Sequence, residues 1–196
     1  MKLAQKWCVG KGLEIGGASY APLGVDALNV QPFPGHPVFE AEEIRLMGRV
    51  LPVDIEAFAD DIPVADDSQD FVISSHVLEH VANVVAAFVE WHRVIRPGGI
   101  VFMIVPHVDR TFDAGRPVTP LAHIIEDWQT RRTEHLPCAP EGHRHVWRTA
   151  DLVEVVDWCN EQSLVDWEIV EVEDVDSRCG NGFTIVCRKN PPLGVV

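Results

Sequence analysis

Histidines are the side chains in this sequence best suited to proton transfer near neutral pH. The sequence contains 9 of them. An imidazole titrates in this range and can take the proton from a hydroxyl group as its oxygen attacks. We predict three candidate general bases, each beside a predicted strand end or in the long polar segment that follows one: His76, His107 and His145. Of these, His107 and His145 are preferred.

A metal site is the alternative use of the same residues. His143 and His145 are two residues apart, which on an extended segment puts both imidazoles on one side. Asp109, Asp113 or His123 could complete a set of zinc or manganese ligands, but only if at least three of these side chains converge. We therefore assign no metal ligands from the sequence and keep metal binding as the alternative.

The elements that must position these histidines are predicted between Asp70 and His107. Residues 71–73 form a short apolar run, residues 77–95 have the apolar period of an amphipathic helix, and residues 96–99 (Arg-Pro-Gly-Gly) end that helix. A second apolar run follows at residues 100–105. Strand, helix and strand in this order form a parallel crossover unit, whose ligands bind beyond the carboxyl ends of the strands.

A glycine turn near the start of the chain is the second feature of chemical interest. Residues 12–15 form an apolar run that includes Glu14 and ends at Gly16 and Gly17. Glycine lets the backbone approach a ligand closely, and we expect the amides of this turn to be free to donate hydrogen bonds. The pattern by itself fits an ordinary strand-to-loop turn equally well.

The remaining elements complete an α/β pattern. Further strands are predicted at residues 26–30, 49–54, 167–175 and 183–188, and helices at about 39–47 and 149–159. Thr149 is expected to cap the last helix. The last two strands, joined by a loop that contains Asn181 and Gly182, predict an antiparallel closing hairpin.

Composition limits the classes of partner. The 196 residues include 16 basic and 30 acidic side chains, and the net charge of -14 argues against binding to nucleic acid or to an anionic membrane. The 5 cysteines show no paired spacing, which suits a reducing compartment. With no signal peptide or long apolar run in the sequence, we expect a cytoplasmic protein. We predict one domain over residues 1–196, with a lid or acceptor-binding insertion at about 107–148.

Four motifs in order carry a resemblance to a known family. They lie at residues 13–17, 61–72, 76–81 and 93–99. Over roughly residues 10–110 the chain resembles the class I S-adenosylmethionine-dependent methyltransferases of the small type-11 kind. The resemblance implies a Rossmann-like α/β fold with a seven-stranded sheet, mostly parallel with an antiparallel last strand, and helices on both faces. It also implies S-adenosylmethionine as the cofactor and methyl transfer by direct displacement at the sulfonium.

The resemblance also implies which residues hold the cofactor. Glu14 and the glycine turn would meet the methionyl end, and Ser75 and His76 would close over it. Gln31 stands at the ribose hydroxyls, where the family usually has an acidic residue. The full implied set is Glu14, Gly16, Gly17, Gln31, Phe58, Ala59, Asp60, Ser75 and His76.

Residues 107–148 resemble a subgroup of these methyltransferases, found in bacterial glycan and natural-product pathways, that has a similar Phe-Asp and Arg-Pro pattern. The substrate-binding residues expected there are Asp109, Asp113, Arg116, His123 and His143. We expect methyl transfer to a small-molecule or sugar acceptor at oxygen, while carbon and nitrogen acceptors stay open.

Two other functions remain as alternatives. One is a non-catalytic adenosyl-ligand or protein-binding module on the same fold, which a fold alone does not exclude. Gln31 and the short N-terminal segment favour it, and a homodimer could cover the exposed side of such a site. The other, a nicotinamide-dependent oxidoreductase, is less favoured because the glycine turn lacks a third glycine that opens a helix.

Overall fold

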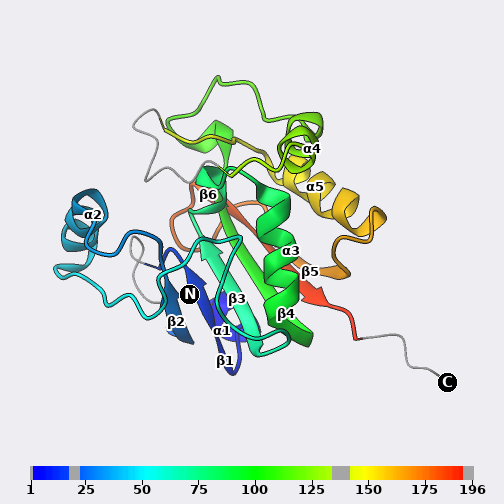
Figure 1. The fold of residues 1–196 in the computed structure, drawn as a ribbon. Coiled ribbons are helices and arrows are strands. Elements are labelled where there is room, and N and C mark those ends of the chain that lie inside the picture. Colours follow the sequence, from blue (N-terminus) through cyan, green and yellow to red (C-terminus); the bar gives the residue numbers. More distant parts are fainter. Residues whose placement is uncertain (1, 18–22, 134–141, 192–196) are drawn as a thin grey trace.

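The structure is a computed structural model that describes residues 2–17, 23–133 and 142–191. Its centre is a six-stranded sheet in the order β2-β1-β3-β4-β6-β5 (Figure 1). The strands are β1 (Lys11–Ile15), β2 (Asp26–Val30), β3 (Gln69–Ser75), β4 (Ile95–Pro106), β5 (Trp167–Glu173) and β6 (Gly182–Lys189). Strands β1 to β4 pair in parallel, and β6 runs antiparallel to both of its neighbours. The predicted α/β sheet with an antiparallel closing hairpin is therefore confirmed.

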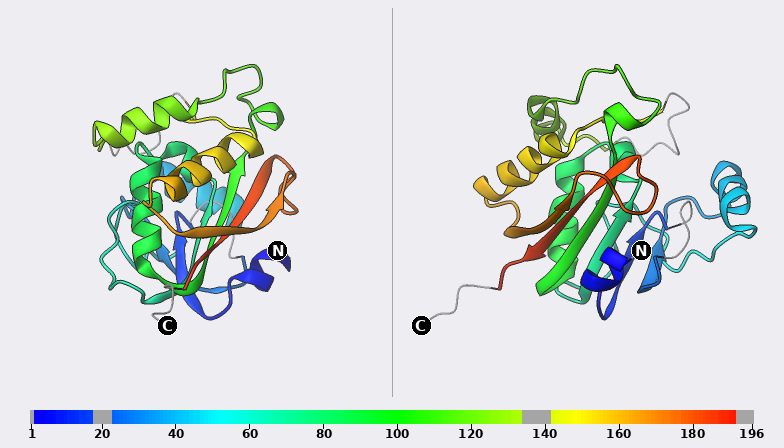
Figure 2. Two further views of the ribbon diagram at one scale, coloured as in Figure 1. Left: turned by 90° about the vertical axis from the view of Figure 1, so that its right-hand side faces the viewer. Right: turned by 180° about the vertical axis from the view of Figure 1, so that it is seen from behind.

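The helices lie on both faces of this sheet and over its edge. They are α1 (Lys2–Trp7), α2 (Pro37–Met47), α3 (Val84–Val94), α4 (Leu121–Gln129) and α5 (Thr149–Glu161), with 3-10 turns η1 (Leu78–His80) and η2 (Val108–Arg110). The larger core packs α3, α4 and α5 against one face, and a smaller core packs α1 against the other (Figure 2). No helix in the described ranges is long and apolar enough to cross a membrane.

The predicted seventh strand at residues 49–54 is wrong. In the described ranges, the strand-type pairing of this part of the chain with β2 is limited to an isolated parallel bridge between Val30 and Ile55. The amides of Asp54 and Ile55 both donate to the carbonyl oxygen of Asn29, at 3.0 and 3.1 Å. Pro52 has no amide hydrogen to extend such a ladder, so the segment follows the sheet edge without becoming a strand.

The single helix predicted over residues 77–95 is also wrong, because the structure divides it into η1 and α3. Asn83 begins α3, and its side-chain oxygen accepts a hydrogen bond from the amide of Ala86 at 3.0 Å. The Asn83 amide group donates to the carbonyl oxygen of Asp127 at 3.2 Å. An N-cap residue has a non-helical backbone, so it separates the two helical segments. The apolar residues keep a helical spacing across Asn83, so the sequence pattern did not indicate this break.

The cap of α5 differs from the prediction by one residue. Arg148 is the N-cap, and its amide donates to the Asp151 carboxylate at 2.7 Å. Thr149 is the first residue of the helix, and its hydroxyl donates instead to the Asp174 carboxylate at 2.5 Å. The predicted cap is therefore wrong, although the helix itself is confirmed.

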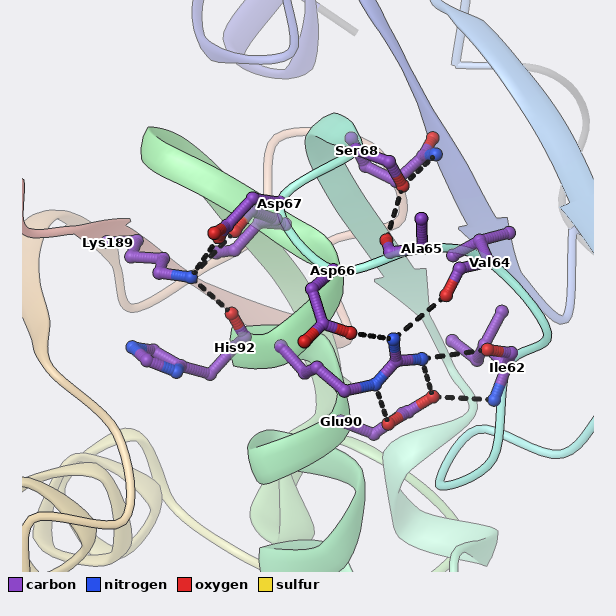
Figure 3. Close-up of polar contacts among 12 residues, drawn as sticks. Ile62, Val64, Ala65, Asp66, Asp67, Ser68, Glu90, His92 and Lys189 are labelled. Carbon is purple, nitrogen blue, oxygen red and sulfur yellow. Dashed lines mark hydrogen bonds and ion pairs between the residues drawn. The ribbon is translucent and has the colours of Figure 1, made fainter.

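Two cations near the end of α3 fasten the loop that precedes β3. Arg93 donates to both carboxylate oxygens of Glu90 and to the carbonyl oxygens of Ile62 and Val64, at 2.6 to 2.9 Å (Figure 3). Arg93 also pairs with Asp66 at 2.6 Å. Lys189, at the end of β6, donates in the same region to Asp67 and to the carbonyl oxygens of His92 and Ile95. Three segments far apart in the sequence meet here.

The predicted insertion begins where β4 ends and carries η2 and α4 (Figure 1). Its two ends lie side by side, because His107 and Trp147 form a parallel bridge and the amide of Val108 donates to the Trp147 carbonyl oxygen at 3.0 Å. Part of the insertion, with Cys138, lies outside the described residues. The four described cysteines, Cys8, Cys159, Cys179 and Cys187, are free thiols.

Candidate functional site

The glycine turn lies at the carboxyl end of β1 and packs against the segment that follows β3. Gly16 has a φ of 65°, and a Cβ atom added to it would lie 2.4 Å from a methyl carbon of Val77. The left-handed conformation and the close contact each disfavour any larger residue. This turn therefore fixes the distance between the first strand and the residues after Ser75.

The amides of this turn are not free, which corrects the prediction. Gly16 donates to the carbonyl oxygen of Val30 at 2.8 Å, and Gly17 donates to the side-chain oxygen of Asn29 at 3.2 Å. The Asn29 side chain in turn donates to the carbonyl oxygen of Pro52 at 2.9 Å. Asn29 was not predicted as a site residue. Its place as a polar residue one position before the end of β2 was the available signal.

Glu14 is largely buried beneath this turn, on the face of the sheet that α1 covers. Burial raises the pKa of the Glu14 carboxyl group to about 7, and the positive charge of Arg178 partly opposes the shift. Its side chain also lies within van der Waals range of Gly17, since a Cβ atom added there would be 3.0 Å from the Glu14 carboxyl carbon. The structure therefore brings Glu14, Gly16 and Gly17 together.

Three side-chain oxygen atoms at the ends of β2 and β3 are buried without a hydrogen-bond partner in the described parts of the chain. The atoms are Oε1 of Gln31 and the hydroxyl oxygens of Ser74 and Ser75, and none has a hydrogen-bond partner among the described residues. Gln31 is 5% exposed and Ser75 is 7% exposed. Buried polar groups in native proteins normally have partners, so such atoms at a strand edge mark a place where a ligand could bind.

The segment predicted to meet adenine lies beside the end of β2. Phe58 packs edge-on against Phe33, with ring centroids 5.4 Å apart. The carbonyl oxygen of Ala59 accepts a hydrogen bond from the Trp91 indole at 2.9 Å, and Asp60 follows in the same turn. Phe33 was not predicted. Its aromatic side chain in a loop directly after Gln31 was the signal that could have identified it.

A buried glutamate, also not predicted, gathers three histidines beyond the end of β3. The Glu79 side chain is 1% exposed, and one of its oxygens lies 3.7 Å from Nε2 of His80 and 3.8 Å from Nε2 of His143. Nδ1 of His76 lies 4.0 Å from the same oxygen. Burial raises the pKa of Glu79 to about 8 and lowers the pKa of both His76 and His80 to about 4. We name this group, His76, Glu79, His80 and His143, the Glu79 cluster.

Two predicted substrate-binding residues support one member of the Glu79 cluster. Asp113 is buried, and its carboxylate lies 2.5 Å from Nδ1 of His143 and 2.5 Å from the guanidinium of Arg116. Arg116 also donates to the carbonyl oxygen of His143 at 2.9 Å. The structure thus brings Asp113, Arg116 and His143 together, as the sequence pattern suggested for one site.

The two preferred general bases are already engaged with the protein. Nδ1 of His107 accepts a hydrogen bond from the amide of Asp109 at 3.2 Å, so its lone pair is in use. His145 is 2% exposed, lies 3.0 Å from the carbonyl oxygen of Val81 through Nε2, and stacks on Trp147. A carbonyl oxygen only accepts, so Nε2 of His145 carries the proton.

The other predicted substrate-binding residues lie apart from the Glu79 cluster in their contacts. Asp109 is exposed and pairs with Arg148 at 2.8 Å. His123 lies 3.4 Å from the carboxylate of Asp127, which also faces His145 at 4.0 Å. The structure therefore divides the predicted substrate-binding residues into three groups.

The loop between β5 and β6 contributes residues that the sequence did not identify. Asp176 is buried, and its carboxylate accepts hydrogen bonds from the amides of Arg178, Cys179 and Gly182 at 2.7 to 3.0 Å. These amides hold the pKa of Asp176 below its ordinary value in spite of burial. The charges of Asp176 and Arg178 both act on His76. An Asp two residues before an Arg in a hairpin loop is too common a pattern to have indicated this.

Comparison with known proteins finds similarity to methyltransferases over part of the chain. Residues 40–103 match the model of a methyltransferase domain family. A curated relative from Mycobacterium avium strain 104, named an uncharacterized methyltransferase, is 37% identical over 98 residues, and this match covers 45% of the present chain and 36% of the relative. A relative from Mycolicibacterium paratuberculosis is 36% identical over a segment of the same length. The match thus spans well under half of the relatives' own length.

Solved structures share the fold at lower identity. The cyclase SpnF has a TM-score of 0.59 and 17% identity, with 96% of this chain and 78% of that chain covered. An S-adenosylmethionine-dependent methyltransferase from Methanosarcina mazei has a TM-score of 0.54 and 18% identity, with 92% of each chain covered. The predicted resemblance to the class I S-adenosylmethionine-dependent methyltransferases is therefore confirmed by the methyltransferase-domain match over residues 40–103, by the curated relatives and by the shared fold. S-adenosylmethionine is the cofactor named for the Methanosarcina mazei neighbour.

Proposed function

We propose that this protein is an S-adenosylmethionine-dependent methyltransferase that methylates an oxygen atom of a small-molecule or sugar acceptor, of the kind found in glycan or natural-product pathways. The observation that carries the proposal is the set of buried, unpaired polar atoms of Gln31 and Ser75 beside the glycine turn. The cofactor has ribose hydroxyls, an amino group and a carboxylate that would pair with such atoms. The position at the carboxyl ends of parallel strands supports the same conclusion.

In this proposal the cofactor lies along the ends of β1, β2 and β3. Gln31 meets the ribose, Phe58 with Ala59 and Asp60 meets the adenine, and Glu14 supports the glycine turn at the methionyl end. The described parts of residues 107–148 form the acceptor side of the same single domain. His143 and Arg116 are the acceptor-binding residues that the contacts favour, since Asp113 holds both.

The reaction needs few groups from the protein. The acceptor oxygen attacks the methyl carbon, the carbon–sulfur bond breaks, and the products are the methyl ether, S-adenosylhomocysteine and a proton. Holding the nucleophile in line with the methyl group would supply most of the rate enhancement. His76 is the favoured acceptor of the proton among the three predicted bases, because it directly follows Ser75 and burial keeps its imidazole neutral at pH 7.

Calorimetric titration with S-adenosylmethionine and S-adenosylhomocysteine tests the cofactor site. We expect saturable binding by the native chain and at least tenfold weaker binding by Gln31→Met, which keeps the side-chain volume and removes the polar atoms. Gln162→Met, at the exposed end of α5, is the matched control and should bind like the native protein. Absence of binding of either compound at millimolar concentration would overturn the proposed function.

A non-catalytic binding module on the same fold is the second candidate. Two observations favour it: the fold is shared with a protein described as a cyclase, and the amides of Gly16 and Gly17 bond within the protein. It predicts binding of S-adenosylhomocysteine without its production from S-adenosylmethionine. A screen of sugars, phenols and amines for S-adenosylhomocysteine release decides between the two. Light scattering of the purified protein shows whether a second copy is present to cover the acceptor side.

A further inference from the structure

The Glu79 cluster lacks the contacts that would explain a buried carboxylate. Neither oxygen of Glu79 has a hydrogen bond to another described residue, although the side chain is 1% exposed. The nitrogen atoms nearest to it lie at 3.7 to 4.0 Å, beyond the range of a hydrogen bond. A buried, unpaired carboxylate is costly, so a positively charged group held between these atoms would remove a large penalty.

The distances between the ligand atoms of the Glu79 cluster are slightly longer than those between the ligand atoms of a bound metal ion. One ligand atom from each of Glu79, His80 and His143 lies within 4.8 Å of the others. In a tetrahedral zinc site with bonds of about 2.0 to 2.1 Å, neighbouring ligand atoms are about 3.3 Å apart. The observed 3.7 and 3.8 Å from Glu79 to the two imidazoles exceed this by about half an ångström, and the two imidazoles lie within 4.8 Å of each other.

The contact between His143 and Asp113 supplies the second half of a metal site. The Asp113 carboxylate lies 2.5 Å from Nδ1 of His143 and 2.5 Å from the guanidinium of Arg116, so Nδ1 is the nitrogen that donates to it. The lone pair of a neutral His143 is then on Nε2, the atom that faces Glu79. A carboxylate on the far nitrogen of a histidine is the usual way of orienting a metal ligand.

We infer that Glu79, His80 and His143 bind a divalent transition-metal ion, with zinc the best match to this ligand set. Two histidines and one glutamate are a set found in catalytic zinc sites, which keep a further position for water or substrate. Of the metal ligands considered from the sequence, only His143 belongs to this set. Glu79 and His80 take the place of the others.

A second group of similar composition does not qualify. His123, Asp127 and His145 also place ligand atoms within 4.8 Å of one another among the described residues. However, Nε2 of His145 is the atom that faces Asp127, and its proton is committed to the carbonyl oxygen of Val81. Arg132 already pairs with the Asp127 carboxylate at 3.0 Å. This group therefore serves as the internal control.

The position of the site suggests what the remaining coordination position does, and this step rests on the proposed function. Val77, which lies between His76 and the η1 turn, contacts the glycine turn that would hold the methionyl end of the cofactor. An acceptor hydroxyl bound to the ion would lose its proton to His76 more readily, because a metal lowers the pKa of a bound hydroxyl. The acceptors that suit this site are therefore sugars or other hydroxylated compounds.

Metal titration of the full chain tests the site without reference to activity. After dialysis against a chelator, we expect the native protein to bind one Zn²⁺ or Co²⁺ per chain, with the visible absorption of tetrahedral cobalt and a chelator-reversible rise in Tm. Glu79→Gln and His143→Ala should weaken Zn²⁺ binding at least a hundredfold, and Asp113→Asn by tenfold to a hundredfold. His123→Ala should bind like the native chain.

A variant with a gained signal makes the result independent of any loss of folding. His80→Cys should add an intense near-ultraviolet band from thiolate to Co²⁺, and His123→Cys should not. Absence of saturable metal binding by the native chain, or loss of binding in His123→Ala but not in His143→Ala, would overturn the inference. Cofactor binding without metal binding would leave the proposed function standing, whereas metal binding without cofactor binding would remove the function and keep the site.

Discussion

Glu14 shows how one residue can link the fold to the site. Its carboxyl group is buried beneath the glycine turn, and burial raises its pKa from 4.5 to about 7. The folded state therefore favours the protonated form. The stability that this provides is complete below the ordinary pKa near 4.5 and is lost as the pH rises through about 7.

The substitution Glu14→Gln removes this titration. We expect the native chain to lose, relative to the variant, on the order of 3 kcal/mol of unfolding free energy between pH 4.5 and pH 8. Urea unfolding of both proteins, without cofactor, at several pH values measures the difference. Glu168→Gln, an exposed carboxylate on β5, controls for the change in net charge. Parallel pH profiles for native chain and Glu14→Gln would contradict the prediction.

Individual residues of the site were predictable where a motif marks a backbone feature. Gly16 was identified because a strand that ends in two glycines predicts a tight turn, and its φ of 65° bears this out. Glu79 was not identified as part of the site, since the helix period gave it only an outward face. It lies 3.8 Å from His143, more than sixty residues later in the chain, and no local sequence pattern indicates such a contact.

At the scale of elements, Asn83 decides where the crossover helix begins. Its side chain both caps α3 and contacts α4 through the carbonyl oxygen of Asp127. Asn83→Ala removes both hydrogen bonds and should destabilise the protein by about 2 kcal/mol. Asn83→Ser keeps a capping oxygen and loses only the longer contact, so we expect about 1 kcal/mol. Thermal and urea unfolding measure both, and equal losses for the two variants would mean that the cap contributes nothing.

The helices and strands differ in how well the sequence predicted them. The strands β1, β2 and β6 were placed to within one residue at each end, because their runs are short and end at glycine or polar residues, whereas β4 begins at Ile95, before the predicted run at residues 100–105. The break before α3 was missed because Asn83 lies between Val81 and Val84, whose spacing continues the apolar period across it. The extra strand was predicted from the apolar residues between 49 and 54, but Pro52 has no amide hydrogen for a ladder, and its carbonyl oxygen accepts from the Asn29 side chain.

At the scale of the whole molecule, contacts between distant segments hold the sheet and its loops in place. Arg93 and Lys189 both act on the loop before β3, one from α3 and the other from the last strand. The loop passes to β3, whose far end carries Ser75 and leads to the Glu79 cluster. From the sequence, Arg93 was noted only as part of the motif at residues 93–99 that resembles the family and as a favourable charge near a helix end. Its main structural role, holding the loop before β3, depends on contacts that only the fold creates.

Arg93 and Arg96, both in the motif at residues 93–99, allow a matched test of how much the contacts of Arg93 with the loop stabilise the protein. Arg93 makes five hydrogen bonds, to Glu90, Asp66 and two carbonyl oxygens, which a lysine cannot reproduce. Arg93→Lys should therefore lower the unfolding free energy by about 2 kcal/mol. Arg96 has a side chain 57% exposed and pairs with Asp70 at the surface, so Arg96→Lys should cost less than about 0.5 kcal/mol. Urea unfolding of both variants compares them directly. If Arg96→Lys proved as costly as Arg93→Lys, surface charge rather than the fastening of the loop would account for the effect.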